Sequence, residues 1–158
     1  MRHLAHLATR FFRSLWSGRP GVERQRLVAA HLAPEEAEVF WRQPVPDLSH
    51  ALRGADHLAA NAPGRSDLIR AFLLHDVGKR HSRLGTLRRS LVTALALIAL
   101  PVGRRGRMYL DHAAIGAVEL DQLGCEELVV EFARGHHGPC PPGLAMPDWA
   151  LLRAADRR

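Results

Sequence analysis

Apolar residues return at every third or fourth position along most of the chain, and no segment alternates apolar and polar residues as a half-buried strand does. Clusters of glycine and proline separate these periodic stretches, as turns between helices do. The chain has 158 residues, of which 47% are hydrophobic and 24% charged, so it can bury a core of its own. The sequence therefore predicts an all-α fold.

Helix starts and stops can be placed from the same pattern. Asp47 and Ser66 are expected to cap the helices that follow them, and a turn rich in glycine and arginine is expected over 102–107. The most apolar run, 91–100, has about half of the ~20 residues that a membrane-spanning helix needs, so we expect a buried helix there. The expected helices cover 2–16, 22–32, 34–41, 47–61, the stretch from 66 through HDVGK, 87–100, a helix that follows the turn over 102–107, carries His112 and stops at Gly124, 126–135, and a last one from 147.

Five histidines and two aspartates are spread over about 100 residues of this helical pattern. Imidazole nitrogens and carboxylate oxygens together suit iron, manganese or zinc, and seven such groups exceed what one ion would hold. A helical bundle can bring side chains from distant helices to one interior point, so their separation along the chain is no obstacle. The predicted ligands of a two-metal site are His50, His75, Asp76, His112, His136, His137 and Asp156.

The firmest context among these residues is the stretch 71–79, AFLLHDVGK, in which an apolar helix leads into His75 and Asp76 and breaks at Gly78. With a leading histidine and a trailing aspartate, this order resembles the HD-domain superfamily of metal-dependent phosphohydrolases. The double histidine resembles its two-metal branch, which includes the HD-GYP cyclic-dinucleotide phosphodiesterases. Those proteins carry a Gly-Tyr-Pro signature and usually an acidic residue after the double histidine, whereas this chain reads GHHGPCPPG.

The resemblance, which runs from about residue 50 to 156, implies a fold and a cofactor. It implies an HD-domain helical bundle over 46–158, with additional helices in an N-terminal extension, 1–45, packed on it. Two divalent ions are expected, iron or manganese first, with zinc, nickel or magnesium as alternatives. By the same resemblance, one ion takes His50, His75, Asp76 and Asp156, and the other takes Asp76, His112, His136 and His137.

The activity implied is hydrolysis of a phosphoester or phosphoanhydride in a nucleotide or another small phosphorylated metabolite, with metal-bound hydroxide as the nucleophile. Asp76 and Lys79 are the expected catalytic residues. Lys79 follows Asp76 by three positions, so a continuing helical turn would let its ammonium group contact a phosphate oxygen. Arg53 and Arg83 are further candidates for substrate binding, with solvated surface charge as the alternative for each.

Several alternatives stay open at this point. His57 lies on the same predicted helix as His50 and is a second candidate for the leading ligand. If only one metal binds, His112 and the double histidine would contact substrate instead. The functional alternatives are a dinucleoside-polyphosphate hydrolase, as in small single-domain HD proteins, and a non-enzymatic HD module that senses a nucleotide.

Charge and cysteine content bound the partners and the compartment. The net charge of +6 favours anionic partners such as a phosphorylated substrate. No helix-turn-helix, zinc-finger spacing or aromatic platform supports nucleic-acid binding.

Two cysteines without CxxC spacing predict a cytoplasmic protein. The basic amphipathic segment 1–19 is expected to pack on the core, with peripheral contact to anionic lipid or docking to a partner as the alternative. The oligomeric state is left open.

Overall fold

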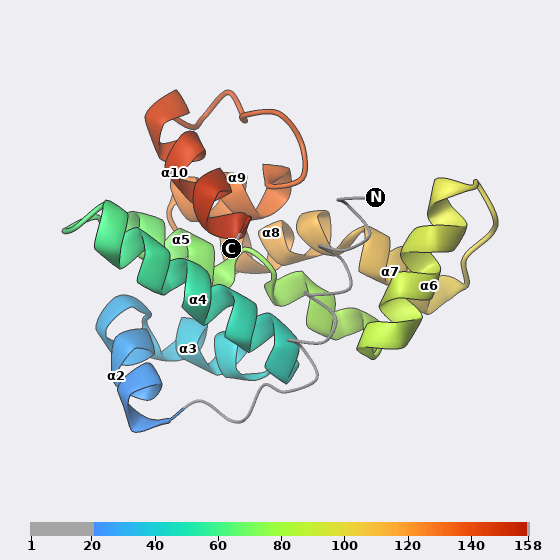
Figure 1. Cartoon of the computed structure of the whole chain (residues 1–158), viewed down its shortest axis with the longest axis horizontal. Coiled ribbons are helices and arrows are strands. Elements are labelled where there is room, and N and C mark those ends of the chain that lie inside the picture. Colours follow the sequence, from blue (N-terminus) through green and yellow to red (C-terminus); the bar gives the residue numbers. More distant parts are fainter. Residues whose placement is uncertain (1–20, 158) are drawn as a thin grey trace.

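A computed structural model describes residues 21–157, and every regular element in this part of the chain is a helix (Figure 1). The all-α prediction is confirmed, while the helix expected over 2–16 lies outside the described residues. No helix between residues 21 and 157 has both the length and the hydrophobicity needed to cross a bilayer. The α-helices are α2 (Val22–His31), α3 (Pro34–Trp41), α4 (Val45–Asn61), α5 (Ser66–Leu74), α6 (Thr86–Leu97), α7 (Arg104–Leu110), α8 (His112–Gln122), α9 (Glu127–Gly135) and α10 (Met146–Asp156), and η1 (Val77–Ser82) is a 3₁₀ helix.

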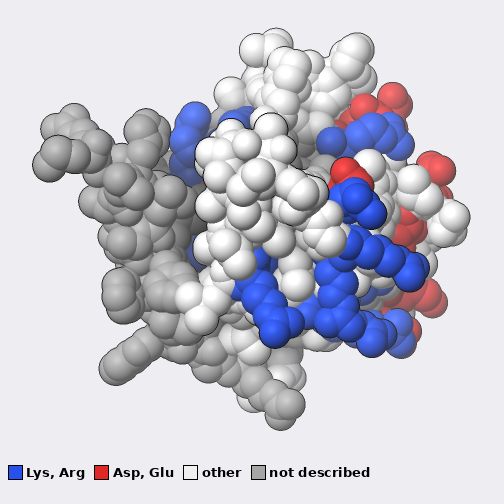
Figure 2. Space-filling view, turned by 90° about the vertical axis from the view of Figure 1, so that its right-hand side faces the viewer, with Lys and Arg blue, Asp and Glu red and all other residues white. Residues whose placement is uncertain are grey.

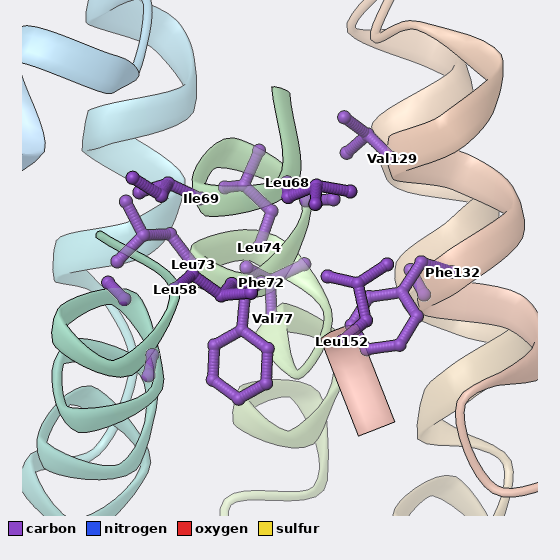
Figure 3. Close-up of a cluster of buried hydrophobic side chains, with 14 of the residues drawn as sticks. Leu58, Leu68, Ile69, Phe72, Leu73, Leu74, Val77, Val129, Phe132 and Leu152 are labelled. Atoms are coloured by element: carbon purple, nitrogen blue, oxygen red, sulfur yellow. The ribbon is translucent and has the colours of Figure 1, made fainter. Parts of the chain in front are cut away.

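Helix α5 forms the centre of the core. It packs against α2, α3, α4, α9 and α10, so that it has apolar neighbours on all sides. In Figure 3 its leucines and Phe72 lie between Leu58 of α4 and Phe132 of α9, with Leu152 of α10 close by. All of these large side chains have no exposed surface. The core thus fixes the C-terminal end of α5, which leads directly into His75 and Asp76.

Helix α6 departs from its prediction. The sequence predicted a buried helix, but α6 extends away from the core (Figure 1), and Leu87, Leu91 and Ile98 are 72%, 58% and 67% exposed. Arg89 is the buried residue of this helix. The apolar residues of this segment predicted a helix correctly, but they could not predict whether another helix would pack against it. The turn expected over 102–107 was also wrong, because most of it belongs to α7.

Both predicted caps form other contacts. Asp47 lies in the first turn of α4, after Pro44 as the N-cap, and both of its oxygens accept bonds of 2.8 Å from Arg89. Ser66 is the first residue of α5, and its hydroxyl lies 2.7 Å from the Nδ1 atom of His31. The helices begin near the predicted places, but distant residues compete for the side chains that would have capped them.

Glu36 is a buried carboxylate that joins α3 to α5 and to the start of α9. It accepts three bonds of 2.8–3.1 Å from Arg70, one of 2.9 Å from the Ala33 backbone N–H, and one of 2.9 Å from the Cys125 thiol. Burial alone would raise the pKa of Glu36, but these bonds hold it below the usual value of 4.5. Burial and the adjacent carboxylate raise the pKa of Cys125 to about 12, so this thiol remains a neutral donor.

Substitution of Glu36 by Gln should lower the free energy of unfolding by about 2 kcal/mol at neutral pH, because Arg70 loses its buried carboxylate partner and keeps only the more exposed Glu126. The native carboxylate contributes stability above its unfolded pKa that is lost as the pH falls through its lower folded pKa. The variant should therefore show a weaker loss of stability on acidification below about pH 4.5, measured by urea unfolding. Glu38→Gln is the control, since Glu38 pairs with Arg42 on the exposed face of α3 and should change stability by less than about 0.5 kcal/mol.

Candidate metal centre

Five helices bring the seven predicted ligands into one cluster beside the core. His50 lies in the middle of α4, while His75 and His136 are the C-caps of α5 and α9. The remaining ligands follow these caps or lie at the ends of α8 and α10. The buried members are His50, His75, Asp76, His112 and His136, which are at most 8% exposed. The structure therefore brings together residues that are up to 106 positions apart.

One group of potential ligands forms around the first His-Asp pair. The Nε2 atom of His50 lies 3.1 Å from Oδ1 of Asp156, and Nε2 of His75 lies 3.8 Å from the same oxygen. His75 Nε2 also lies 3.3 Å from Oδ2 of Asp76. His50, His75 and Asp76 each offer a ligand atom, and these atoms lie within 4.8 Å of one another. This spacing fits a single ion held between them.

A second group forms on the other side of Asp76. The Nε2 atoms of His112 and His136 each lie 3.4 Å from Oδ1 of Asp76, and Nε2 of His137 lies 3.0 Å from Nε2 of His112. The three histidines offer ligand atoms within 4.8 Å of one another. Since Oδ2 of Asp76 faces His75 and Oδ1 faces this second group, one carboxylate lies between two potential cation sites.

The backbone fixes the orientation of three of the imidazoles. In each case Nδ1 donates to the carbonyl oxygen three residues earlier: His75 to Phe72 at 2.6 Å, His112 to Tyr109 at 2.6 Å, and His136 to Ala133 at 2.8 Å. A neutral imidazole that donates through Nδ1 carries its lone pair on Nε2. Metal-binding histidines are commonly held in this way by a hydrogen bond from the second nitrogen. All three Nε2 atoms face Asp76.

Buried polar atoms at the centre of the cluster lack hydrogen-bond partners. Nε2 of His75, Oδ1 of Asp76 and Nε2 of His136 are buried, and none has a partner among residues 21–157. Leaving such an atom without a partner costs about 1–3 kcal/mol, so native proteins rarely do it. Unpartnered nitrogen lone pairs on both sides of a carboxylate suit divalent cations. The residues present therefore fit the metals that the sequence suggested, and their assignment as ligands remains a prediction.

The electrostatics of the cluster keep its carboxylates ionised. Burial opposes ionisation of Asp76, but the neighbouring His75 and Lys79 hold its pKa well below the usual range. Burial lowers the pKa of His50 and His136. Burial, with the nearby imidazoles of His136 and His112, lowers the pKa of His137 to about 3. The ionised carboxylates and the neutral imidazoles of His50, His136 and His137 are in the protonation states that metal coordination requires. Burial would lower the pKa of His75, but Asp76 and Asp156 raise it above its ordinary value, so a metal ion would compete with a proton at this nitrogen.

Lys79 lies where the sequence placed it relative to Asp76, although the backbone there is a 3₁₀ helix. Its ammonium group bonds to Oδ2 of Asp76, and its side chain is 17% exposed. Burial would lower the pKa of Lys79, but Asp76 and Asp47 raise it above its ordinary value. Lys79 is therefore a cation bonded to the carboxylate at the edge of the cluster, with a side chain that is partly exposed.

The other predicted residues have different positions. Arg53 is half-buried on α4, one turn after His50, and Arg83 lines a separate cleft that contains none of the seven predicted ligands. His57 contacts Asn61 on α4 and is absent from both ligand groups, so the geometry favours His50 as the leading histidine.

Arg153 is a residue at this site that the sequence analysis missed. Its Nη1 atom donates to the backbone carbonyl of His136 and, at 3.1 Å, to Oδ2 of Asp156. It therefore fixes the last carboxylate relative to the double histidine. The spacing of three residues on one helix could have indicated the bond to Asp156. No pattern in the sequence indicates the contact with His136.

Comparisons with models of known protein families, with curated proteins and with solved structures gave no match.

Proposed function

We propose that this chain is a metal-dependent phosphohydrolase of the HD type, acting on a phosphoester or phosphoanhydride in a nucleotide or another small phosphorylated metabolite. The observation that carries the proposal is the position of Asp76 between two groups of histidines, with buried and unpartnered Nε2 atoms facing it. The order of ligands along the chain, which resembles that of the HD-domain superfamily, gives independent support.

The residues divide naturally between two cations. His50, His75 and Asp156 would hold one, the histidines at 112, 136 and 137 would hold the other, and Asp76 would contribute one oxygen to each. Divalent ions in such a pair, when bound, lower the pKa of a water molecule and neutralise charge that develops on a phosphoryl group. The Nδ1 bonds to the backbone keep the imidazoles of His75, His112 and His136 in the orientation that binding requires.

Lys79 is the residue best placed to bind the substrate. An ammonium group has three hydrogens, and only one is needed for the bond to Asp76. Because the side chain is partly exposed, the others can donate to a phosphate oxygen that arrives from solvent. His137 is exposed at the same cluster and completes its solvent-facing side.

Metal analysis of the purified protein, followed by assays on phosphorylated compounds with added manganese or iron, tests the proposal. We expect one or two transition-metal ions per chain and release of phosphate or a nucleotide from at least one class of substrate. The panel should include nucleoside mono-, di- and triphosphates, cyclic dinucleotides and dinucleoside polyphosphates. Nucleotide binding without turnover would favour a sensing module instead, and a protein that retains no metal would contradict the proposal.

A further inference from the structure

A second basic site lies on a different part of the molecule. A cleft of about 670 Å³ opens between the end of α3, the end of η1 and the start of α7. Five arginines, His81 and Met108 line it, and none of the seven predicted metal ligands does. Figure 2 shows basic side chains gathered on the face of the molecule that carries α6 and α7. We call this the arginine cleft; its arginines are Arg42, Arg80, Arg83, Arg104 and Arg105.

Positive charge in the arginine cleft exceeds the negative charge that neutralises it. Glu119 orients two lining residues, with its Oε2 atom 2.6 Å from Nη1 of Arg80 and 3.1 Å from Nε2 of His81. Arg42 pairs with Glu38. The other three arginines, at positions 83, 104 and 105, have no carboxylate within ion-pair distance in residues 21–157. A ligand with several negative charges would complete these contacts.

Arg83 adopts a backbone conformation that arginine rarely takes. Its φ and ψ are 51° and 29°, in the left-handed region, at the C-cap of η1. Glycine adopts this conformation without strain, so a chain that needed only a turn here would be more stable with glycine. Such strain persists where the surrounding structure or the side chain has a role. The geometry is therefore consistent with a need for this guanidinium group in the cleft.

We propose that the arginine cleft binds a linear polyphosphate chain, as found in a nucleoside triphosphate or in free inorganic polyphosphate, at a site separate from the metal centre. Guanidinium groups bind phosphate oxygens in a bidentate manner, which a row of arginines can repeat along the chain. The volume lies within the roughly 300–1,000 Å³ of small-molecule sites. No Phe, Tyr or Trp is among the described residues that line the cleft, so it lacks the large stacking platform of a single-strand nucleic-acid site.

Titration calorimetry on the full chain, treated with a chelator to remove metals, tests the site directly. Inorganic tripolyphosphate and ATP should each bind with one site per chain, and orthophosphate should bind at least about tenfold more weakly, because it reaches fewer arginines. Similar affinities for the first two ligands would identify the phosphate chain itself as the recognised group. At least tenfold tighter binding of ATP would identify a nucleotide as the source. Failure of both to bind would overturn the proposal.

Three variants separate the cleft from general charge effects. Arg83→Gly should weaken tripolyphosphate binding about tenfold without lowering the melting temperature, since glycine relieves the backbone strain. The double variant Arg104→Ala, Arg105→Ala should weaken binding about a hundredfold. Arg88→Ala removes an exposed arginine of α6 outside the cleft and should change affinity less than about twofold. Equal losses in Arg83→Gly and Arg88→Ala would contradict a specific site.

Asp76→Asn makes the test independent of the proposed hydrolase activity. This substitution lies in the candidate metal centre, and the side-chain partners of Asp76 in the described structure, His75, Lys79, His112 and His136, are not residues of the arginine cleft. Tripolyphosphate binding should therefore be retained within about twofold. Loss of binding in this variant would place the phosphate chain at the metal centre and overturn the assignment of a second site.

Discussion

Asp76→Asn should remove most of the metal that we expect in the purified protein and reduce the proposed metal-dependent hydrolysis by at least a factor of about 100. Asparagine has the same shape, so the packing around the side chain is retained. The change removes the negative charge that faces His75 on one side and His112 and His136 on the other. Loss of an outer partner of a ligand costs about 10- to 100-fold in affinity or activity, so loss of a shared ligand should cost more.

The matched control is His57→Ala. His57 lies on α4 with His50 but contacts Asn61 and belongs to neither ligand group. Its removal should leave metal content and turnover within about twofold of the native protein. Metal content measured by mass spectrometry, alongside turnover, gives the result. Two ions per chain in the Asp76→Asn protein, or loss of metal from His57→Ala, would show that the ligands are assigned incorrectly.

The helices could be read from the sequence because their determinants are local. Apolar periodicity and the glycine and proline breaks placed α2, α3, α4, α9 and α10 within one or two residues of their observed bounds. The caps could not be placed in the same way. Asp47 and Ser66 have the side chains of good caps, but Arg89 and His31 bond to them from elsewhere in the chain. The exposure of α6 also depends on how the helices pack, since the same apolar sequence would suit a buried helix.

Convergence of the ligands was predicted from residue types and their order, and only three-dimensional structure could choose among the alternatives. The sequence left His57 open beside His50, and the orientation of α4 decides between them because it directs His50 toward Asp156 of α10, while His57 contacts Asn61 within α4 itself. The fixed Nδ1 bonds and the contact from Arg153 depend on backbone carbonyls, which every residue has and which no sequence pattern distinguishes.

Gly78 allows a close approach of two helices that the sequence did not predict. It was expected only as the break after the His-Asp pair, but η1 packs directly on α8 at this position. A Cβ atom on residue 78 would lie 2.0 Å from the carbonyl oxygen of His112 and 2.7 Å from the backbone nitrogen of Gly116. Both atoms belong to the backbone of α8, so no side-chain rotation can relieve the overlap.

Gly78→Ala should therefore lower the free energy of unfolding by about 3 kcal/mol or more, at the upper end of the usual cost of overpacking. In the molecules that remain folded, η1 must move away from α8. This movement separates Asp76 from His112, whose facing atoms are 3.4 Å apart, so metal retention should fall as well. Thermal or urea unfolding gives the first quantity, and metal content of the folded fraction gives the second.

Gly85→Ala is the control for this effect of volume. Gly85 precedes α6 with a φ of −71°, and no atom lies within 4 Å of a Cβ built on it. The substitution should change stability by less than about 1 kcal/mol, which includes the small preference for glycine over alanine at an N-cap. Equally small effects of Gly78→Ala and Gly85→Ala on stability and metal content would contradict this prediction. They would show that Asp76 stays beside His112 without the close approach of η1 and α8.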